Sequence, residues 1–223
     1  PRDAFHAYFE AFLFKIMRVF NRDVGLMTAA FYTPVLLIEL SIIPIFFIGR
    51  RISGNFGGFV AAMILAIHPA LLTRTAGGFA DTDAYNILIP LIVTWLFLEA
   101  FETKEYKKVI LYTLGAGFFV GLFSFAWGGW WYIMNFIIIT SLAYIAYYIL
   151  LNRDKLKNIG SFIKDRDFLE TPLTLALFLI FSAIFTSFFT GFSNFMDGFL
   201  VGPRAFITLK EVGIDSIWPN VFT

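Results

Sequence analysis

The sequence contains no cysteine, and only 15% of its 223 residues are charged. The missing cysteine excludes disulfides, thiolate metal sites and a cysteine nucleophile. Soluble domains carry about 25% charged residues, whereas here hydrophobic residues reach 59% and phenylalanine alone contributes 30. Seventeen Lys and Arg against sixteen Asp and Glu leave no net field to attract nucleic acid. The composition therefore excludes a soluble enzyme, a nucleic-acid binder and a disordered chain, and predicts an all-α, polytopic membrane protein.

Six apolar stretches approach the roughly 20 residues that a helix needs to cross a bilayer. The connections after the first, third and fifth stretches are basic, and the positive-inside rule places them in the cytoplasm. The other connections, including residues 73–86, are then extracytoplasmic. The predicted spans are residues 27–48, 56–72, 84–101, 109–126, 130–151 and 172–192. The basic residues are Arg50, Arg51, Lys104, Lys107, Lys108, Arg153, Lys155, Lys157, Lys164 and Arg166.

The two ends of the chain differ from this six-helix region at residues 27–192. Within residues 1–26, apolar side chains recur at helical spacing over residues 3–20, which predicts an amphipathic interfacial helix on the outer side. Residues 193–223 form no clean span and predict an external segment with a re-entrant part near residues 199–209. Because the sequence begins at Pro1 and has no signal-peptide pattern, we expect a piece of a longer protein.

The outer loop at residues 73–86 contains Asp81 and Asp83 in a D-x-D pattern. In extended backbone, residues i and i+2 point to the same side, so the two carboxylates could share one cation. Oxygen ligands favour Mg²⁺ or Mn²⁺. Arg74 is suited to a phosphate, because a guanidinium matches phosphate oxygens with paired donors. Taken alone, however, the pattern is more typical of two residues that cap the following helix and favour its dipole.

Three further polar or aromatic features, at Glu39, His68 and residues 127–131, are first interpreted as parts of the fold rather than of a functional site. Glu39 falls at mid-span, where we expect a protonated or paired carboxyl that joins helices. His68 is expected to be a hydrogen-bonded interfacial residue rather than a ligand. The turn at residues 127–131, Trp-Gly-Gly-Trp-Trp, predicts an aromatic belt at the outer interface, with stacking on sugars as the alternative.

Three segments, in chain order, resemble the catalytic subunit of oligosaccharyltransferase in its archaeal form and its bacterial and eukaryotic relatives. The run from Arg74 to Asp83 resembles the family's R-[ST]-x-A-G-x-[FY]-D-x-[DE] run in the second external loop, although residues 76–80 depart from its order. Residues 124–129, S-F-A-W-G-G, resemble the S-x-x-W-G-G run of the third external loop. Residues 218–221, W-P-N-V, are similar to the segment just before the family's S-V-[SA]-E or T-I-x-E motif. This shared order is more specific than any single motif.

The resemblance implies a GT-C fold and a glycosyltransferase activity. The family transfers a glycan from a dolichyl or polyprenyl phosphate or pyrophosphate carrier to the Asn of an N-x-[ST] acceptor polypeptide. By resemblance, Asp81 is a catalytic, metal-binding carboxylate, and Asp83 is the second acidic residue, near the Mn²⁺ or Mg²⁺ ion and the lipid phosphate. The assignment of Arg74 to the lipid phosphate rests on its charge and position. The implied partners are lipid-linked oligosaccharide, acceptor polypeptide and membrane lipids. The implied location is an archaeal plasma membrane, with the active-site loops outside.

Several parts of the family pattern are not found in residues 1–223: the first helix, the catalytic Asp of the first external loop, the Glu of the T-I-x-E type and the soluble domain with W-W-D-Y-G. We therefore expect this chain alone to have no transferase activity.

Two alternatives stay open. Another polyprenyl-phosphate-sugar transferase of the same architecture, for mannose or aminoarabinose, would place its acidic pair in the first external loop. A transporter or non-catalytic scaffold would line the midplane with charged residues, where only Glu39 lies here.

Overall fold

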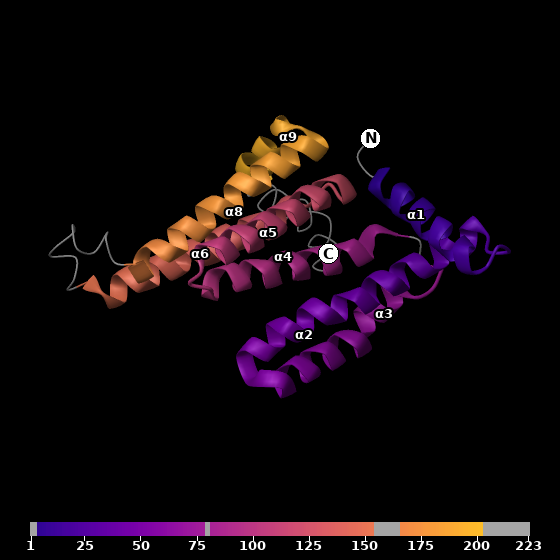
Figure 1. Cartoon of the computed structure of the whole chain (residues 1–223), viewed down its shortest axis with the longest axis horizontal. Helices are drawn as coiled ribbons and strands as arrows, with labels where there is room; N and C mark the ends of the chain where they lie inside the picture. Colours follow the sequence, from indigo (N-terminus) through magenta and orange to yellow (C-terminus); the bar gives the residue numbers. More distant parts are fainter. Residues whose placement is uncertain (1–3, 79–80, 154–165, 203–223) are drawn as a thin grey trace, which may run out of the picture.

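The fold was analysed in a computed structural model, which describes residues 4–78, 81–153 and 166–202. Every regular element within these ranges is helical, which confirms the all-α prediction (Figure 1). The elements are α1 (Ala4–Phe20), α2 (Leu26–Ile67), α3 (Pro69–Thr75), the 3₁₀ turn η1 (Thr82–Ala84), α4 (Tyr85–Glu102), α5 (Tyr106–Ala126), α6 (Trp131–Leu151), α8 (Arg166–Thr190), α9 (Phe192–Met196) and the π-helical turn η3 (Asp197–Val201).

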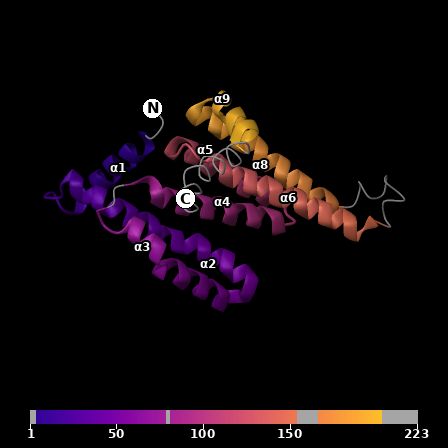
Figure 2. The ribbon, with the colours of Figure 1, turned by 180° about the vertical axis from the view of Figure 1, so that it is seen from behind.

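Helix α2 contains two of the predicted spans. Its backbone leaves the helical region at Ser53 and Gly54, where Gly54 has a φ of 63°. The two arms lie side by side in both views (Figures 1 and 2). They approach so closely that a Cβ on Gly57 would lie 2.7 Å from the carbonyl oxygen of Gly49. Five helices in the described part of the chain are long and apolar enough to span a membrane, and α2, which contains two of the predicted stretches, is one of them, so the count roughly matches the predicted six.

Proline and glycine explain where the predicted boundaries were wrong. The second arm of α2 ends at Ile67, not at residue 72, because Pro69 forces His68 out of the helical region (ψ 117°) and starts α3. Helix α8 begins before Pro172 and ends at Thr190, where Gly191 has a φ of 97°. Of the re-entrant part expected near residues 199–209, only residues up to 202 lie in the described ranges, and η3 occupies them to Val201.

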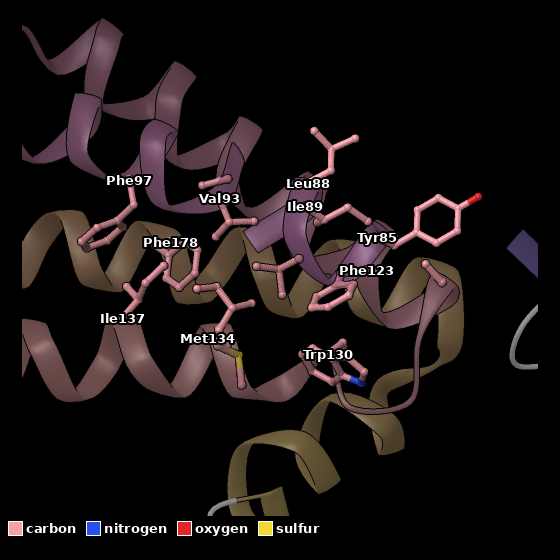
Figure 3. Close-up of a cluster of buried hydrophobic side chains, with 14 of the residues drawn as sticks. Tyr85, Leu88, Ile89, Val93, Phe97, Phe123, Trp130, Met134, Ile137 and Phe178 are labelled. Carbon is pink, nitrogen blue, oxygen red and sulfur yellow. The ribbon is translucent and has the colours of Figure 1, made fainter. Parts of the chain in front are cut away.

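The bundle is held by close contact between α5 and α8, and α4 packs on α5. Gly117 and Gly121 make this approach possible, since a Cβ on either would lie 2.6 Å from the Cβ of a phenylalanine on α8, Phe181 and Phe185 respectively. The spacing of these two glycines therefore serves helix packing. Figure 3 shows the core that results, with side chains from α4, α5, α6 and α8.

The Trp127–Trp131 turn only partly fits the aromatic-belt prediction. Trp130 is 1% exposed and belongs to the core. A Cβ on Gly198 would lie 2.6 Å from its ring, so this glycine makes room for the indole. For Trp130 the belt prediction is wrong, because the turn folds its side chain inward beneath η3.

A charged cluster ties the tip of the α2 hairpin to the end of α4. Arg51 lies 2.5 Å from Glu99 and also pairs with Glu102, and the indole nitrogen of Trp95 donates to Glu99 at 2.9 Å. The ring of Trp95 stacks on Phe47 of α2 at 4.8 Å. The tip of the hairpin and the carboxyl end of α4 therefore lie at the same end of the bundle.

Glu39 is not part of such a cluster. Its side chain is exposed on α2, and no ion pair or hydrogen bond joins it to another residue in the described ranges. Of the expectation of a protonated or paired carboxyl that joins helices, the pairing is therefore wrong for this part of the chain, because the side chain is exposed.

We expect Gly121→Ala to destabilise the protein by about 1–3 kcal/mol, the usual cost of overpacking. The added methyl would meet the backbone of Phe185, which cannot move aside easily. The measurement is thermal unfolding in detergent. Gly115→Ala on the same helix is the matched control, since only the end of the Leu96 side chain is near, at 3.2 Å. Equal effects of the two substitutions would contradict this account of the α5–α8 contact.

Candidate functional site

The loop that follows α3 folds back onto the beginning of α2. Gly78 has a φ of 101°, a conformation that favours glycine, and its amide donates to the carbonyl of Phe31 at 3.3 Å. Residues 79–80 lie outside the described ranges. From Asp81 the chain continues directly into η1 and α4. This arrangement places the D-x-D pattern at the end of the bundle opposite the Arg51 cluster.

Asp81 and Asp83 do not lie in one extended segment, so that expectation is wrong. Asp81 is extended (φ −124°, ψ 164°), but Thr82–Ala84 form a 3₁₀ turn. The Oδ1 atom of Asp81 accepts from the amide of Thr82 at 2.6 Å. Asp81 is thus the N-cap of this turn, and a capping carboxylate at the start of a helix is stabilised by the free amides there. The capping interpretation holds for Asp81.

Asp83 has a different partner, the guanidinium of Arg74 at the end of α3. The Nη1 atom of Arg74 donates to Oδ2 of Asp83 at 3.3 Å. Both side chains reach solvent, with 69% and 35% of their side-chain surface exposed. The structure therefore brings Arg74 and Asp83 together, a pairing that the sequence analysis did not predict, and places Asp81 two residues away on the same turn.

The first residue of α4, Tyr85, contacts α1 across this end of the bundle. Its ring is 1% exposed and is surrounded by the rings of Phe5, Phe9 and His6. Its hydroxyl lies 3.2 Å from Nδ1 of His6, and Nε2 of His6 lies 3.0 Å from Oε1 of Glu10. The contact with Tyr85 is a hydrogen bond, whereas the contact with Glu10 is a close approach of Nε2 and Oε1 without hydrogen-bond geometry.

The next residue of α4, Asn86, is held from the opposite side by α6. The hydroxyl of Tyr132 donates to the backbone carbonyl of Asn86 at 3.1 Å. That carbonyl would ordinarily accept from the amide four residues later, but residue 90 is proline and has no amide hydrogen. Tyr132 therefore supplies the donor that Pro90 removes.

The donor set of this loop consists of oxygen ligands of the kind that a hard divalent cation prefers. Asp81 and Asp83 offer carboxylate oxygens, which Mg²⁺ and Mn²⁺ prefer. No cluster of three or more His, Cys, Asp or Glu side chains able to hold a metal occurs within the described ranges. Mg²⁺ usually keeps several waters and takes one or two carboxylates from the protein, so two are enough for such a site.

The chain matches the family model "Oligosaccharyl transferase STT3, N-terminal" over residues 6–215. The chain belongs to the oligosaccharyl transferase STT3 family. It is 33% identical over 226 residues to the dolichyl-phosphooligosaccharide-protein glycotransferase of Methanococcus voltae, covering 95% of this chain and 24% of that protein. It is 27% identical over 101 residues to the undecaprenyl-diphosphooligosaccharide–protein glycotransferase of Campylobacter jejuni, covering 45% of this chain and 13% of that protein. The chain thus spans about a quarter of the length of the first of these STT3 relatives.

The solved structures agree on the fold. The archaeal oligosaccharyltransferase AglB from Archaeoglobus fulgidus, in complex with an inhibitory peptide and a dolichol-phosphate, superposes with a TM-score of 0.64 at 19% identity. The match covers 98% of this chain and 26% of that one. The chain therefore has the helical membrane fold of this STT3 protein and is a multi-pass membrane protein.

Sequence reasoning missed the residues that hold the start of α4. His6 and Glu10 were part of the predicted interfacial helix, but nothing in their spacing indicated a contact with Tyr85. Tyr132 could have been suspected, because Pro90 within a span leaves a carbonyl in need of a donor. His68 lies exposed between α2 and α3, and its side chain caps no amide of α3.

We expect Arg74→Ala to change the free energy of unfolding by less than about 1 kcal/mol, since exposed ion pairs contribute little. Arg51→Ala is the comparison, because the Arg51 side chain is 17% exposed and faces two carboxylates. Its loss leaves Glu99 with only the indole of Trp95 and should cost about 1–3 kcal/mol, the usual loss of hydrogen bonds to a charged group. Chemical unfolding of both variants measures the difference. A loss at Arg74 as large as that at Arg51 would show that this pair maintains the fold.

Proposed function

We propose that the chain is the membrane part of a glycosyltransferase that moves a glycan from a dolichyl or polyprenyl phosphate or pyrophosphate to Asn in N-x-[ST] acceptor proteins. Membership of the STT3 family supports this proposal, because the relatives are named as glycotransferases that act on protein with lipid-linked oligosaccharides. The observation that carries it is the meeting of Arg74 with the D-x-D turn. There, two carboxylates and a solvent-exposed guanidinium share one end of the bundle.

Each of these residues has a distinct role in the proposal. Asp81 and Asp83 would hold a Mn²⁺ or Mg²⁺ ion, and this ion would stabilise the negative charge on the departing phosphate. An archaeal oligosaccharyltransferase of the same fold has been crystallised with zinc and sulfate, which supports a cation and an oxyanion in such proteins. Arg74 uses Nη1 for Asp83, so its other N–H groups remain to bind phosphate oxygens of the lipid carrier.

We also propose that the D-x-D end faces the outside of an archaeal plasma membrane. The basic residues Arg50 and Arg51 lie at the tip of the α2 hairpin, and Lys104 follows α4, so positive charge gathers at the opposite end. Positive charge marks the cytoplasmic side. The pairing of Arg51 with Glu99 and Glu102 supports one common end for these connections.

In the full-length natural protein, we expect Asp81→Ala to lower glycan transfer to an N-x-[ST] peptide by at least about a hundredfold, because the metal loses a ligand that holds it at the phosphate. The assay uses lipid-linked glycan extract with Mn²⁺, and EDTA should abolish the wild-type activity. Glu39→Gln is the matched control, because it removes a carboxylate on an exposed face of α2. Activity that does not depend on Asp81 would reduce its role to the cap of η1. No transfer by the wild-type protein would favour a sister transferase or a scaffold.

A further inference from the structure

The first turn of α4 is fixed from two sides by tyrosine hydroxyls. On one side α1 holds Tyr85 through His6, with contacts of 3.2 Å and, onward to Glu10, 3.0 Å. On the other side Tyr132 of α6 holds the Asn86 carbonyl at 3.1 Å. In Figure 3 the ring of Tyr85 lies at the end of the core cluster with its hydroxyl directed away from it. Tyr85 and Asn86 lie just after Asp83 in the chain, with only Ala84 between Asp83 and Tyr85.

On the side of α4 that faces the α2 hairpin, η1 packs against α2 and α3, and Arg74 of α3 pairs with Asp83, but the packing beyond η1 is open. A cavity of about 400 Å³ lies there, lined by His68, Asn86 and Pro90 among other side chains. The Oδ1 atom of Asn86 is buried and has no hydrogen-bond partner within the described ranges. Because Pro90 also removes one helical hydrogen bond from this turn, the hydroxyl of Tyr132 replaces a contact that the helix itself cannot make.

We propose that Tyr85, with His6 behind it, and Tyr132 are positioning residues that hold Asp81 and Asp83 in the geometry that binds a divalent cation. This inference rests on the proposed function, because it assumes the metal site there. Neither tyrosine touches the cation. Their hydroxyls fix the backbone next to the turn that carries both carboxylates. A preorganised site binds its ligand more tightly, because binding does not also cost the entropy of ordering the turn.

The test is Mn²⁺ binding to the full-length natural protein, followed by electron paramagnetic resonance. Tyr85→Phe and Tyr132→Phe keep both rings and remove only the hydroxyls. We expect each to raise the Mn²⁺ dissociation constant about three- to tenfold, which corresponds to the net free energy of one hydrogen bond. Tyr144→Phe is the matched control, since its ring packs on Phe101 at the far end of α4. It should leave Mn²⁺ affinity unchanged.

A second variant separates positioning from general loss of packing. Pro90→Ala restores an amide that can donate to the Asn86 carbonyl, so in this background Tyr132→Phe should cost less than about twofold in Mn²⁺ affinity. A merely structural contribution of Tyr132 would give the same loss in both backgrounds and would overturn the inference.

The remaining outcomes distinguish the two proposals. Wild-type Mn²⁺ binding that is lost in Asp81→Ala but unchanged in Tyr85→Phe and Tyr132→Phe would leave the proposed function intact and overturn the positioning role. Absence of Mn²⁺ binding by the folded wild-type protein would overturn both.

Discussion

The structure around the candidate site depends on one backbone carbonyl that has lost its usual donor. Pro90 lies in a membrane-spanning helix, where an unsatisfied carbonyl is expensive because no water is available. The hydroxyl of Tyr132 meets the carbonyl of Asn86 and so couples α6 to the start of α4. The same turn is coupled to α1 through Tyr85 and His6. Helices α1 and α6, which are distant in sequence, therefore both contact the start of α4 just after the D-x-D turn, and the turn itself packs against α2 and α3.

Charge is arranged around this bundle according to the cost of burying it. Arg51, Glu99 and Glu102 form a cluster near one end, and Arg74 and Asp83 form an exposed pair near the other. Between these ends the core is made of aromatic and aliphatic side chains, with threonine and serine hydroxyls that donate to their own helix, such as Thr113 to Val109. Within the described ranges, the ion pairs among Lys, Arg, Asp and Glu lie near the ends of this bundle. This is why the carboxylates of the D-x-D turn, rather than a buried residue, are the candidates for catalysis.

Most of the fold could be predicted from the sequence because hydrophobic length and loop charge report directly on membrane spans. The boundaries were less accurate where proline acts through its neighbours: Pro69 ends a helix two residues earlier, at Ile67, whereas Pro172 is tolerated inside α8. The inward position of Trp130 could not be predicted, because it depends on the space above Gly198, far along the chain.

For the candidate site, local sequence placed Arg74, Asp81 and Asp83 in one short outer loop, but it did not predict the ion pair between Arg74 and Asp83. The 3₁₀ conformation of Thr82–Ala84 was not predicted, because capping by Asp81 decides it and the D-x-D pattern is compatible with either backbone. The contacts from His6 and Tyr132 come from distant segments and were beyond local reasoning.

The measurement that tests the central claim most directly is the position of a Mn²⁺ ion in the full-length natural protein, located by its anomalous scattering in crystals. The account predicts a single peak at the outer end of α4, at about 2.0–2.3 Å from carboxylate oxygens of both Asp81 and Asp83. A peak at other residues, or none at saturating Mn²⁺ while Asp81 still caps Thr82, would contradict it.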